Sequence, residues 1–497
     1  MQKNNLYYQS TRGDKKRVLS AEAIIKGIAD DGGLFVPDVI PRINKDLYKI
    51  KSIDYKELAF LIMKEFLNDY RQDELKDCIN RAYDNKFDTE IIAPLSKKMG
   101  AYFLELYHGP TLAFKDMALS ILPHLFKKAA RQLNFNQEII ILTATSGDTG
   151  KAALQGFANV KGTKIIVFFP YKGVSKIQER QMLTQEGANT YVIGIKGNFD
   201  DAQRGVKEIF EDLAFNKKIE EKNYIFSSAN SINIGRLIPQ IVYYFYAYLN
   251  MLDEGEIKNS EKINIVVPTG NFGDILAAYY AKEMGLPVNK LICASNENRV
   301  LVDFFDTGVY DKRRKLVMTI SPSMDILVSS NLERLLWTIG EKDAQQVRKL
   351  MNSLRDKGFY QINSEMKKKL KDFYGGFTPQ EESRWCIKEI FEESKYLIDP
   401  HTAVAYAVYK KYVKETGDKT KTVIVATASP FKFTKSVMES IDSRYKKFND
   451  FKLIEKMSDL AQIPIPSGIR DIEKRPIRHK IVCEKEEMRT KITEILE

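Results

Sequence analysis

Two hydrophobic rhythms divide the chain. In the first hundred residues, apolar positions such as Leu58, Leu61, Ile62 and Phe66 recur three or four residues apart, which is the spacing of one helix face. The stretch DELKDCINRAYDNK continues this spacing, and an earlier helical run is expected to end within the segment DGGLFVP. Residues 1–100 are therefore predicted to form a mainly helical N-terminal domain.

From residue 102 onward, short β-branched and aromatic runs alternate with helical patterns. These runs read AYFLELY, EIIILTAT, TKIIVFFP, TYVIGI, INIVVPT, KLICAS and TVIVATA. Strands that alternate with helices form mostly parallel sheets covered by helices on both faces. The predicted fold class is α/β, with one α/β domain over residues 101–260 and a second over 261–440. The second domain is expected to carry a helical insertion at about 296–395, and residues 441–497 are expected to form a C-terminal extension without assigned chemistry.

One lysine stands in an apolar setting just before a helical run. In HGPTLAFKD, Gly109 and Pro110 indicate a turn, and Lys115 precedes helix-spaced apolar residues. A lysine has an ordinary pKa of about 10.4, and burial favours its neutral amine, which can attack an aldehyde cofactor. A lysine that lays its stem along apolar surface at a helix end would produce the same pattern. Lys115 alone therefore decides nothing.

Two glycine-containing loops each follow a predicted buried strand and precede a predicted helix. One is SGDTG at residues 146–150, and the other is GNFGD at residues 270–274. Backbone N–H groups at a helix N-terminus attract anions, and glycines let a phosphate or carboxylate approach closely. Each loop alone could be an ordinary strand-to-helix turn. Together with a candidate lysine, the pair is a more specific signal.

These motifs are similar to those of the threonine synthase family, which are pyridoxal-phosphate enzymes of fold type II, the type of the tryptophan-synthase β-subunit. The family's lysine motif reads HGPTLAFKD here, its substrate loop SGDTG and its cofactor-phosphate loop TGNFGD. Further matching blocks are SAEAIIKGIADDGGLFVPDVIP, NSINIGRLIPQIVYYF, DPHTAVAYA and ATASPFKFTKSV. The resemblance runs from about Tyr7 to Val437, and it implies a fold type II architecture and pyridoxal 5'-phosphate as the cofactor.

The resemblance also implies roles for the matching positions. Lys115 would hold the cofactor covalently, and Thr427 would hydrogen-bond its pyridine nitrogen. The cofactor phosphate would lie on the loop formed by Gly270, Asn271, Phe272, Gly273 and Asp274. Asp274 is expected to be a residue of the helix first turn rather than the partner of the pyridine nitrogen. The substrate carboxylate would lie on the loop formed by Ser146, Gly147, Asp148 and Thr149.

The reaction implied by the resemblance converts O-phospho-L-homoserine and water to L-threonine and phosphate by γ-elimination and β-addition, the last step of threonine biosynthesis. Lys115 would be its main base. Since a phosphate monoester carries nearly two negative charges, its binding site needs further polar side chains, for which the candidates are Lys151, Arg12, Ser146 and Thr149. A related lyase of the same fold, a dehydratase or phospholyase, would instead release ammonia and a keto acid.

Other residues near these motifs have competing interpretations. Arg12 could bind a phosphate through two N–H groups, or it could lie on the surface of a flexible terminus. His401 is expected to cap a helix or lie in the core rather than transfer protons. The aromatic run 243–246 is expected in core packing or a subunit contact. Ser429 stands where family members usually carry His, and its effect on the site is left open.

Composition argues against several other classes of protein. A chain of 497 residues exceeds one hydrophobic core, and its 44% apolar and 29% charged residues are typical of globular proteins. The net charge is +11, but the basic residues are dispersed among acids and no RNA-module motif occurs, so no nucleic-acid partner is expected. Four scattered cysteines suggest neither a metal site nor a disulfide framework. Without a signal-peptide core or an apolar run of about 18 residues, a cytoplasmic protein without a membrane partner is expected, as a monomer or homodimer.

Overall fold

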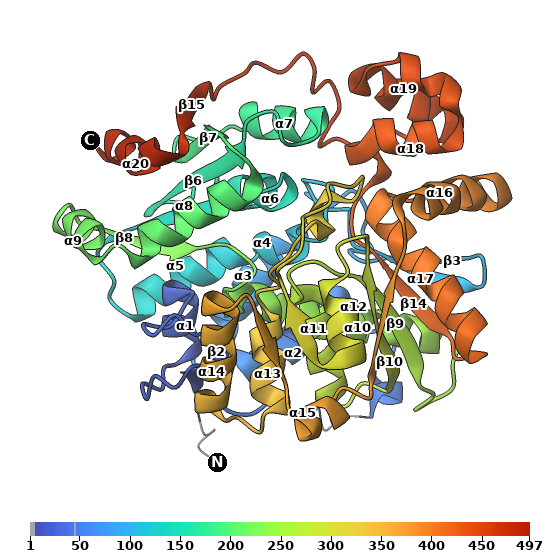
Figure 1. The fold of residues 1–497 in the computed structure, drawn as a ribbon, viewed down its shortest axis with the longest axis horizontal. Coiled ribbons are helices and arrows are strands. Elements are labelled where there is room, and N and C mark those ends of the chain that lie inside the picture. The colour runs from blue at the N-terminus through green and yellow to red at the C-terminus, as the bar shows by residue number, and fades with distance from the viewer. Residues whose placement is uncertain (1–4, 44–45) are drawn as a thin grey trace.

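A computed structural model describes residues 5–43 and 46–497 of the chain. Two mostly parallel sheets with helices against them form most of the molecule (Figure 1). The predicted α/β class is therefore confirmed. The first four residues of the expected N-terminal domain lie outside the described part of the chain. Within that part, no helix is both long and apolar enough to cross a membrane.

The larger sheet has six strands. Five are parallel, and β3 pairs antiparallel with β4 at one edge. In spatial order the strands are β13 (Phe373–Phe377), β10 (Val288–Ser295), β9 (Ile263–Pro268), β14 (Thr422–Ala426), β4 (Ala101–Glu105) and β3 (Leu95–Lys98). Because β4 pairs with β14 in the register Val423 to Tyr102, the stretch expected as one domain from residue 101 gives its first strand to the sheet of the other.

The smaller sheet has five strands, all parallel. In spatial order they are β15 (Ile481–Glu484), β7 (Thr190–Lys196), β6 (Thr163–Pro170), β5 (Glu138–Ala144) and β8 (Tyr224–Ser228). The two edge strands β8 and β15 were not among the predicted runs. Figure 1 shows the chain beyond α19 crossing over α7 to reach β15, so the C-terminal extension completes this sheet.

Helices of the first half of the chain pack around the smaller sheet and the N-terminal region. These are α1 (Ser20–Lys26), α2 (Tyr55–Phe66), α3 (Gln72–Ala82), α4 (Asp116–Leu119), α5 (Leu122–Gln132), α6 (Asp148–Phe157), α7 (Lys176–Leu183), α8 (Phe199–Glu211) and α9 (Leu213–Glu221). The predicted helices α2 and α3 are confirmed, but α1 ends earlier than expected, at Lys26. Gly27 follows it with φ 72°, a left-handed conformation that glycine adopts without strain. A short antiparallel pair, β1 (Tyr8–Ser10) and β2 (Phe35–Pro37), and the 3-10 turn η1 (Leu47–Ile50) complete this region.

Most helices of the second half lie around the larger sheet, whereas the last one packs against the smaller sheet. They are α10 (Ile234–Asp253), α11 (Gly273–Glu283), α12 (Val300–Thr307), α13 (Leu332–Ile339), α14 (Ala344–Asp356), α15 (Ser364–Lys368), α16 (Gln380–Ser394), α17 (Pro400–Thr416), α18 (Thr434–Ile441), α19 (Asp450–Ala461) and α20 (Met488–Leu496). Short 3-10 turns lie between them: η2 (Pro322–Met324), η3 (Pro430–Phe433), η4 (Ser443–Lys447) and η5 (Lys485–Glu487). The segment expected as a C-terminal extension therefore contains the helices α19 and α20.

The region expected as a helical insertion also contains strands. β11 (Val309–Asp311) and β12 (Phe359–Gln361) form a small antiparallel pair, and β13 joins the larger sheet beside β10. β13 was not predicted as a strand because two of its five residues are glycines, which are uncommon in strands. A Cβ on Gly376 would lie 2.5 Å from Cγ1 of Val408, and one on Gly375 would lie 3.0 Å from Cα of Val302. These glycines let α12 and α17 pack closely onto the sheet.

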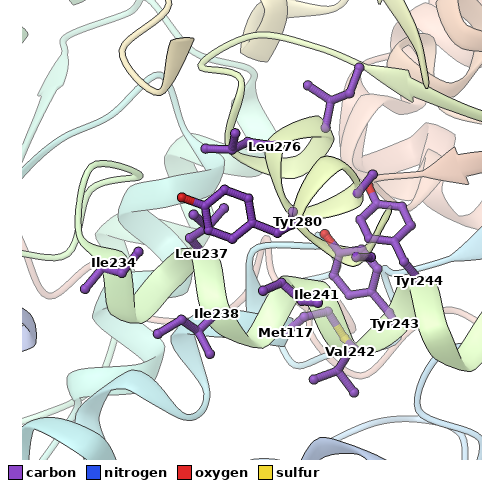
Figure 2. Packing of buried hydrophobic residues seen from close by; sticks show 14 of the residues in the cluster. Met117, Ile234, Leu237, Ile238, Ile241, Val242, Tyr243, Tyr244, Leu276 and Tyr280 are labelled. Carbon is purple, nitrogen blue, oxygen red and sulfur yellow. The ribbon is translucent and has the colours of Figure 1, made fainter. Parts of the chain in front are cut away.

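The long helix α10 is buried along most of its length and connects the two halves of the core. Figure 2 shows its apolar side chains packed against Leu276 and Tyr280 of α11 and against Met117 of α4. Full burial of one Leu, Ile, Val or Met side chain stabilises the folded state by roughly 1.5–3 kcal/mol relative to leaving it exposed. The aromatic run 243–246 was expected in core packing or a subunit contact, and core packing is confirmed for Tyr243, Tyr244 and Phe245, which are buried. α10 therefore fixes the positions of α4 and α11, which carry the candidate site.

Candidate functional site

Lys115 is held in place by a short pairing between two distant loops. The N–H of Phe114 donates to the carbonyl of Thr427 at 2.8 Å, and the N–H of Ser429 donates to the carbonyl of Leu112 at 3.0 Å. Lys115 follows directly, at the start of α4. The pairing therefore brings Lys115 and Thr427, which are far apart in sequence, to one place at the end of β14.

The turn before Lys115 is stabilised by Asp116. Its carboxylate accepts hydrogen bonds from the N–H of Thr111 at 2.8 Å and from the Thr111 hydroxyl at 2.6 Å. A Cβ on Gly109 would lie 2.4 Å from Cβ of Asp116, so only glycine fits at this position. The motif HGPTLAFKD thus has a structural reason for each of these residues.

The Lys115 amine is buried among charges. Its Nζ lies 3.5 Å from a carboxylate oxygen of Asp148, and the residue is only 9% exposed. Burial lowers the pKa of the Lys115 ammonium, and the charges of Arg236 and Lys432 lower it further, while Asp148 opposes them. A lysine with a lowered pKa is a better nucleophile and base near neutral pH.

The loop at residues 146–150 joins β5 to α6, as predicted. The Thr145 hydroxyl accepts hydrogen bonds from the N–H groups of Gly147 and Gly150, at 2.9 and 2.8 Å. Gly147 has φ 129°, and a Cβ there would lie 2.6 Å from the side chain of Gln178. Among the described residues, the hydroxyls of Ser146 and Thr149 make no hydrogen bond, and both residues are partly exposed. The loop is therefore fixed from behind while these two hydroxyls remain available to a ligand.

Asp148, the first residue of α6, is surrounded by donors. Its carboxylate contacts the ammonium of Lys432 at 2.7 Å and the side-chain N–H of Gln178 at 2.8 Å, in addition to Lys115. Burial alone would raise the pKa of the Asp148 carboxyl, but the charges of Lys432 and Lys115 outweigh it and hold the pKa well below its usual range. Asp148 is therefore ionised at neutral pH.

The loop at residues 270–274 joins β9 to α11 and forms an open backbone cradle. Among the described residues, no backbone N–H from Gly270 to Asp274 donates a hydrogen bond. The loop is clamped from outside, since the Ser329 hydroxyl donates to the Gly270 carbonyl at 2.7 Å and the Asn331 N–H donates to the Asn271 carbonyl at 3.1 Å. Unpaired N–H groups at a helix N-terminus bind phosphate.

Asp274 lies in the first turn of α11, as expected, and faces tyrosines rather than cations. The hydroxyls of Tyr243 and Tyr244 both donate to one of its carboxylate oxygens, the latter at 2.6 Å. Its other carboxylate oxygen is buried without a partner among the described residues. Burial raises the pKa of the Asp274 carboxyl to about 6, although the two tyrosine hydroxyls and the charge of Lys115 act in the opposite direction.

Thr427 and Ser429 have different surroundings although they are two residues apart. Among the described residues, the Thr427 hydroxyl makes no hydrogen bond, and the residue is 6% exposed. The Ser429 hydroxyl instead caps the 3-10 turn η3 by accepting the Phe431 N–H. Ser429, the residue that departs from the family pattern, therefore has a structural role: it stabilises the turn that carries Lys432.

Two predicted substrate residues already have partners. The Arg12 guanidinium donates to both carboxylate oxygens of Glu333, at 2.9 and 2.8 Å. The buried Lys151 amine donates to the neutral side chains of Gln185 and Gln155, and burial lowers its pKa to about 7. Lys151 stands beside the 146–150 loop, whereas the structure places Arg12 against α13 and not among the loop residues.

Three residues near Lys115 or Asp148 were not among the site residues predicted from the sequence. Lys432 pairs with Asp148, and His401 accepts the N–H of Ser323 at 3.2 Å, while its other ring nitrogen contacts the helix cap Asp399. Arg236, in the first turn of α10, is 2% exposed and donates one hydrogen bond, to the Ala229 carbonyl at 3.1 Å. Two signals for them were present in the sequence: Lys432 lies inside the apolar stretch SPFKF, and Arg236 lies inside NSINIGRLIP. A charged residue in an apolar stretch is expected to be buried only if it has a partner or a ligand.

Comparison with known protein families gives three matches that together cover most of the chain. Residues 7–83 match "Threonine synthase N terminus", residues 87–428 match "Pyridoxal-phosphate dependent enzyme", and residues 402–490 match "Threonine synthase, C-terminal". The threonine synthase of Saccharomyces cerevisiae is 37% identical over 92% of this chain and 93% of its own length. The chain belongs to the threonine synthase family. Its enzymes depend on pyridoxal phosphate.

Solved structures and other relatives agree with this assignment. The PLP-bound threonine synthase from Brucella melitensis superposes with a TM-score of 0.86 at 32% identity, covering 99% of both chains. The yeast threonine synthase superposes with a TM-score of 0.87 at 34% identity, covering 99% of this chain and 98% of that one. Human threonine synthase-like 1 is 40% identical over 86% of this chain, but this chain spans only 58% of its length.

The chain thus belongs to a family of pyridoxal-phosphate enzymes of fold type II, and the described residues fit that cofactor. Unpaired N–H groups in the 270–274 loop suit a phosphate. A Cβ on Gly270 would lie 2.4 Å from the backbone carbonyl of Ser323, so the loop can follow this path only with glycine. Lys115 offers a buried amine with a lowered pKa, and Thr427 offers an unpaired hydroxyl. When bound, pyridoxal phosphate acts as an electron sink for bonds at the substrate α-carbon.

Proposed function

We propose that this enzyme converts O-phospho-L-homoserine and water to L-threonine and phosphate, the last step of threonine biosynthesis. Relatives named threonine synthase that align along nearly their whole length support this reaction. The observation that carries the proposal is the cation surplus beside the 146–150 loop. Lys115, Lys151 and Lys432 are buried there and Arg236 is buried near Lys115, whereas the buried carboxylates that act on the three lysines are those of Asp116, Asp148 and Asp274.

In this proposal, Lys115 holds the cofactor covalently. Gly270 to Asp274 bind its phosphate through their backbone N–H groups, and the Thr427 hydroxyl faces its pyridine nitrogen. The Asp274 carboxylate stays beneath the loop with its two tyrosines and does not contact the pyridine ring. A hydroxyl rather than a carboxylate at the ring nitrogen leaves that nitrogen largely unprotonated.

The substrate carboxylate binds the 146–150 loop. Backbone N–H groups at the start of α6 and the free hydroxyls of Ser146 and Thr149 are the donors. The Asp148 carboxylate would repel a second carboxylate, but its charge is offset by Lys432 at 2.7 Å. Asp148 therefore contributes its backbone N–H to the substrate carboxylate, and its side chain positions Lys115 and Lys432.

The substrate phosphate binds Arg236 rather than Arg12. Arg12 lies against α13 and already donates two hydrogen bonds to Glu333. The Arg236 Nε–H is buried without a partner among the described residues, and no carboxylate pairs with its guanidinium. A buried guanidinium without an anion is costly, and a bound phosphate removes that cost. Lys151, with only amide partners, is the second cation available to the phosphate.

Proton transfers are assigned to Lys115. Its Nζ removes the proton from the substrate α-carbon, and the same amine returns protons during the later steps on one face of the substrate. The lowered pKa of Lys115 suits this role because it brings the amine closer to the working pH. His401 makes no transfer in this proposal because Asp399 and the Ser323 N–H occupy its two ring nitrogens.

The test is a product assay with the cofactor-loaded protein and O-phospho-L-homoserine. Phosphate and threonine should appear in equal amounts. Release of phosphate with ammonia and a keto acid would instead favour a phospholyase of the same fold. Failure to release any phosphate from O-phospho-L-homoserine would contradict the proposed substrate.

A further inference from the structure

Lys432 is the most completely buried charged group in the site. Its side chain has 0% exposure, and its ammonium contacts the Asp148 carboxylate at 2.7 Å and the Thr111 carbonyl at 2.8 Å. Thr111 belongs to the turn that precedes Lys115, and Asp148 opens the helix that follows the 146–150 loop. One ammonium therefore ties together the lysine turn and the substrate loop.

Asp148 is shared unequally between two lysines. It lies 2.7 Å from Lys432 but 3.5 Å from Lys115. The nearer lysine is rigidly placed, because the N–H of Lys432 donates to the Ser429 carbonyl in η3. The farther lysine must give up its charge to react. Asp148 therefore keeps a permanent counter-ion when Lys115 becomes neutral.

Without Lys432, Asp148 would have only Lys115 as a charged partner at hydrogen-bonding or ion-pairing distance. A buried carboxylate attracts a proton to the nearest amine, so Lys115 would remain an ammonium, which cannot attack an aldehyde. The same carboxylate would also repel a substrate carboxylate on the 146–150 loop. Both effects are removed by one fixed positive charge on the far side of Asp148.

We infer that Lys432 is a positioning residue that offsets the charge of Asp148, so that Lys115 can react with the cofactor aldehyde. In that reaction the Lys115 nitrogen bonds to the aldehyde carbon, and the aldehyde oxygen leaves as water after taking up the protons of the amine. The use of Asp148's loop for a substrate carboxylate rests on the proposed function. The effect on Lys115 does not.

The test measures cofactor capture without substrate. Protein stripped of cofactor is mixed with pyridoxal phosphate from pH 6 to 10, and the rate of the absorbance change is recorded. Lys432→Met should slow capture at pH 7 about tenfold and shift the pH profile upward by about one unit, since one pKa unit changes the neutral fraction of an amine tenfold. The charged groups that act on Lys115 here come from four elements and are Asp148, Arg236, Asp274 and Lys432.

A charge-balanced double variant separates this role from a general structural one. Asp148→Asn should shift the profile downward, and Asp148→Asn combined with Lys432→Met should return it close to wild type. Lys435→Met is the matched control, because Lys435 is exposed three residues along the chain, and it should leave the profile unchanged. Circular dichroism checks that each variant is folded.

Two results would overturn the inference. One is a folded Lys432→Met protein with the wild-type pH profile. The other is a double variant shifted upward as far as the single Lys432 variant, which would mean that Lys432 does not act through Asp148. If Lys432→Met alone does not fold, the comparison of the double variant with Asp148→Asn decides, and identical profiles would contradict the inference. Because no O-phospho-L-homoserine is present, failure here is distinct from failure of the proposed reaction.

Discussion

The two glycine loops look alike in sequence but have opposite electrostatic surroundings. Each joins a parallel strand to a helix and places an aspartate in the first turn, Asp148 in one and Asp274 in the other. Lys115 and Lys432 hold the pKa of the Asp148 carboxyl well below its usual range despite its burial, whereas burial raises that of Asp274 to about 6. The loop motif therefore determines the backbone path, whereas residues distant in sequence determine whether the aspartate in the loop is charged.

The contrast also separates two ways to bind an anion. The 270–274 loop offers unpaired backbone N–H groups and tyrosines, and suits a phosphate held mainly by dipoles. The 146–150 loop lies beside Lys115 and Lys432, with Arg236 near Lys115, and suits a substrate with two anionic groups. We expect variants of the first loop to affect the cofactor and variants of the second region to affect the substrate.

The largest expected effect is from Arg236→Met, tested against Arg12→Met. Removing the unpaired guanidinium should lower kcat/KM for O-phospho-L-homoserine roughly 100- to 1000-fold, because two charge-assisted hydrogen bonds to phosphate are lost. Cofactor affinity should stay within a few-fold of wild type. Arg12→Met should instead lower the free energy of unfolding by about 2 kcal/mol, because the buried Glu333 carboxylate would keep the Thr11 hydroxyl but lose its guanidinium partner, with little change in KM. Steady-state kinetics and denaturant unfolding distinguish the two, and a reversed pattern would contradict the assignment.

Gly270→Ala should act on the cofactor and only secondarily on the substrate. The added Cβ would lie 2.4 Å from the Ser323 carbonyl, so the loop must shift, at about 1–3 kcal/mol for an overpacked site. We expect pyridoxal phosphate affinity to fall roughly 10- to 100-fold in a fluorescence or absorbance titration. Gly194→Ala in β7, outside the loop, is the control for folding, because its added Cβ would lie no closer than 3.4 Å to a neighbouring side chain. Equal affinity in wild type and Gly270→Ala would contradict the placement of the cofactor phosphate.

Asp274→Asn should change how stability depends on pH. The folded pKa of this carboxyl is about 6, above its ordinary value of 3.8, so the folded state binds the proton more tightly. The group therefore favours the folded state at low pH and loses that contribution as pH rises through 6, by roughly 3 kcal/mol in total. The stability difference between wild type and Asp274→Asn, measured by urea unfolding without cofactor, should change by about this amount between pH 3 and 7. A difference that is constant with pH would contradict the raised pKa.

Most of the architecture was predictable because it depends on local patterns. All seven predicted strand runs are strands, and Lys115 precedes a helix as expected. The missed strand β13 depends on glycines that let two helices approach, and the edge strand β15 lies in a C-terminal segment whose short apolar run gave no clear signal. Both depend on packing partners far away in sequence.

The site was predictable as motifs but not as a charge arrangement. The sequence motifs indicated Lys115, Thr427 and the two loops. They did not indicate that the Arg12 guanidinium pairs with the carboxylate of Glu333, 321 residues away in sequence. They also did not indicate that Lys432 reaches Asp148 or that Arg236 is buried without a carboxylate. Such pairings are set by the tertiary fold, since no local pattern encodes which distant side chain neutralises a given charge.

The most direct test of the account is to identify the lysine that carries the cofactor. Three lysines are buried near one another, Lys115, Lys151 and Lys432, and we predict that Lys115 alone forms the covalent link. Borohydride reduction of the pyridoxal-phosphate-loaded protein, followed by proteolysis and mass spectrometry, should place the pyridoxyl group on Lys115. The label should be absent from Lys115→Ala. A label on Lys151 or Lys432 in the wild-type protein would contradict the account.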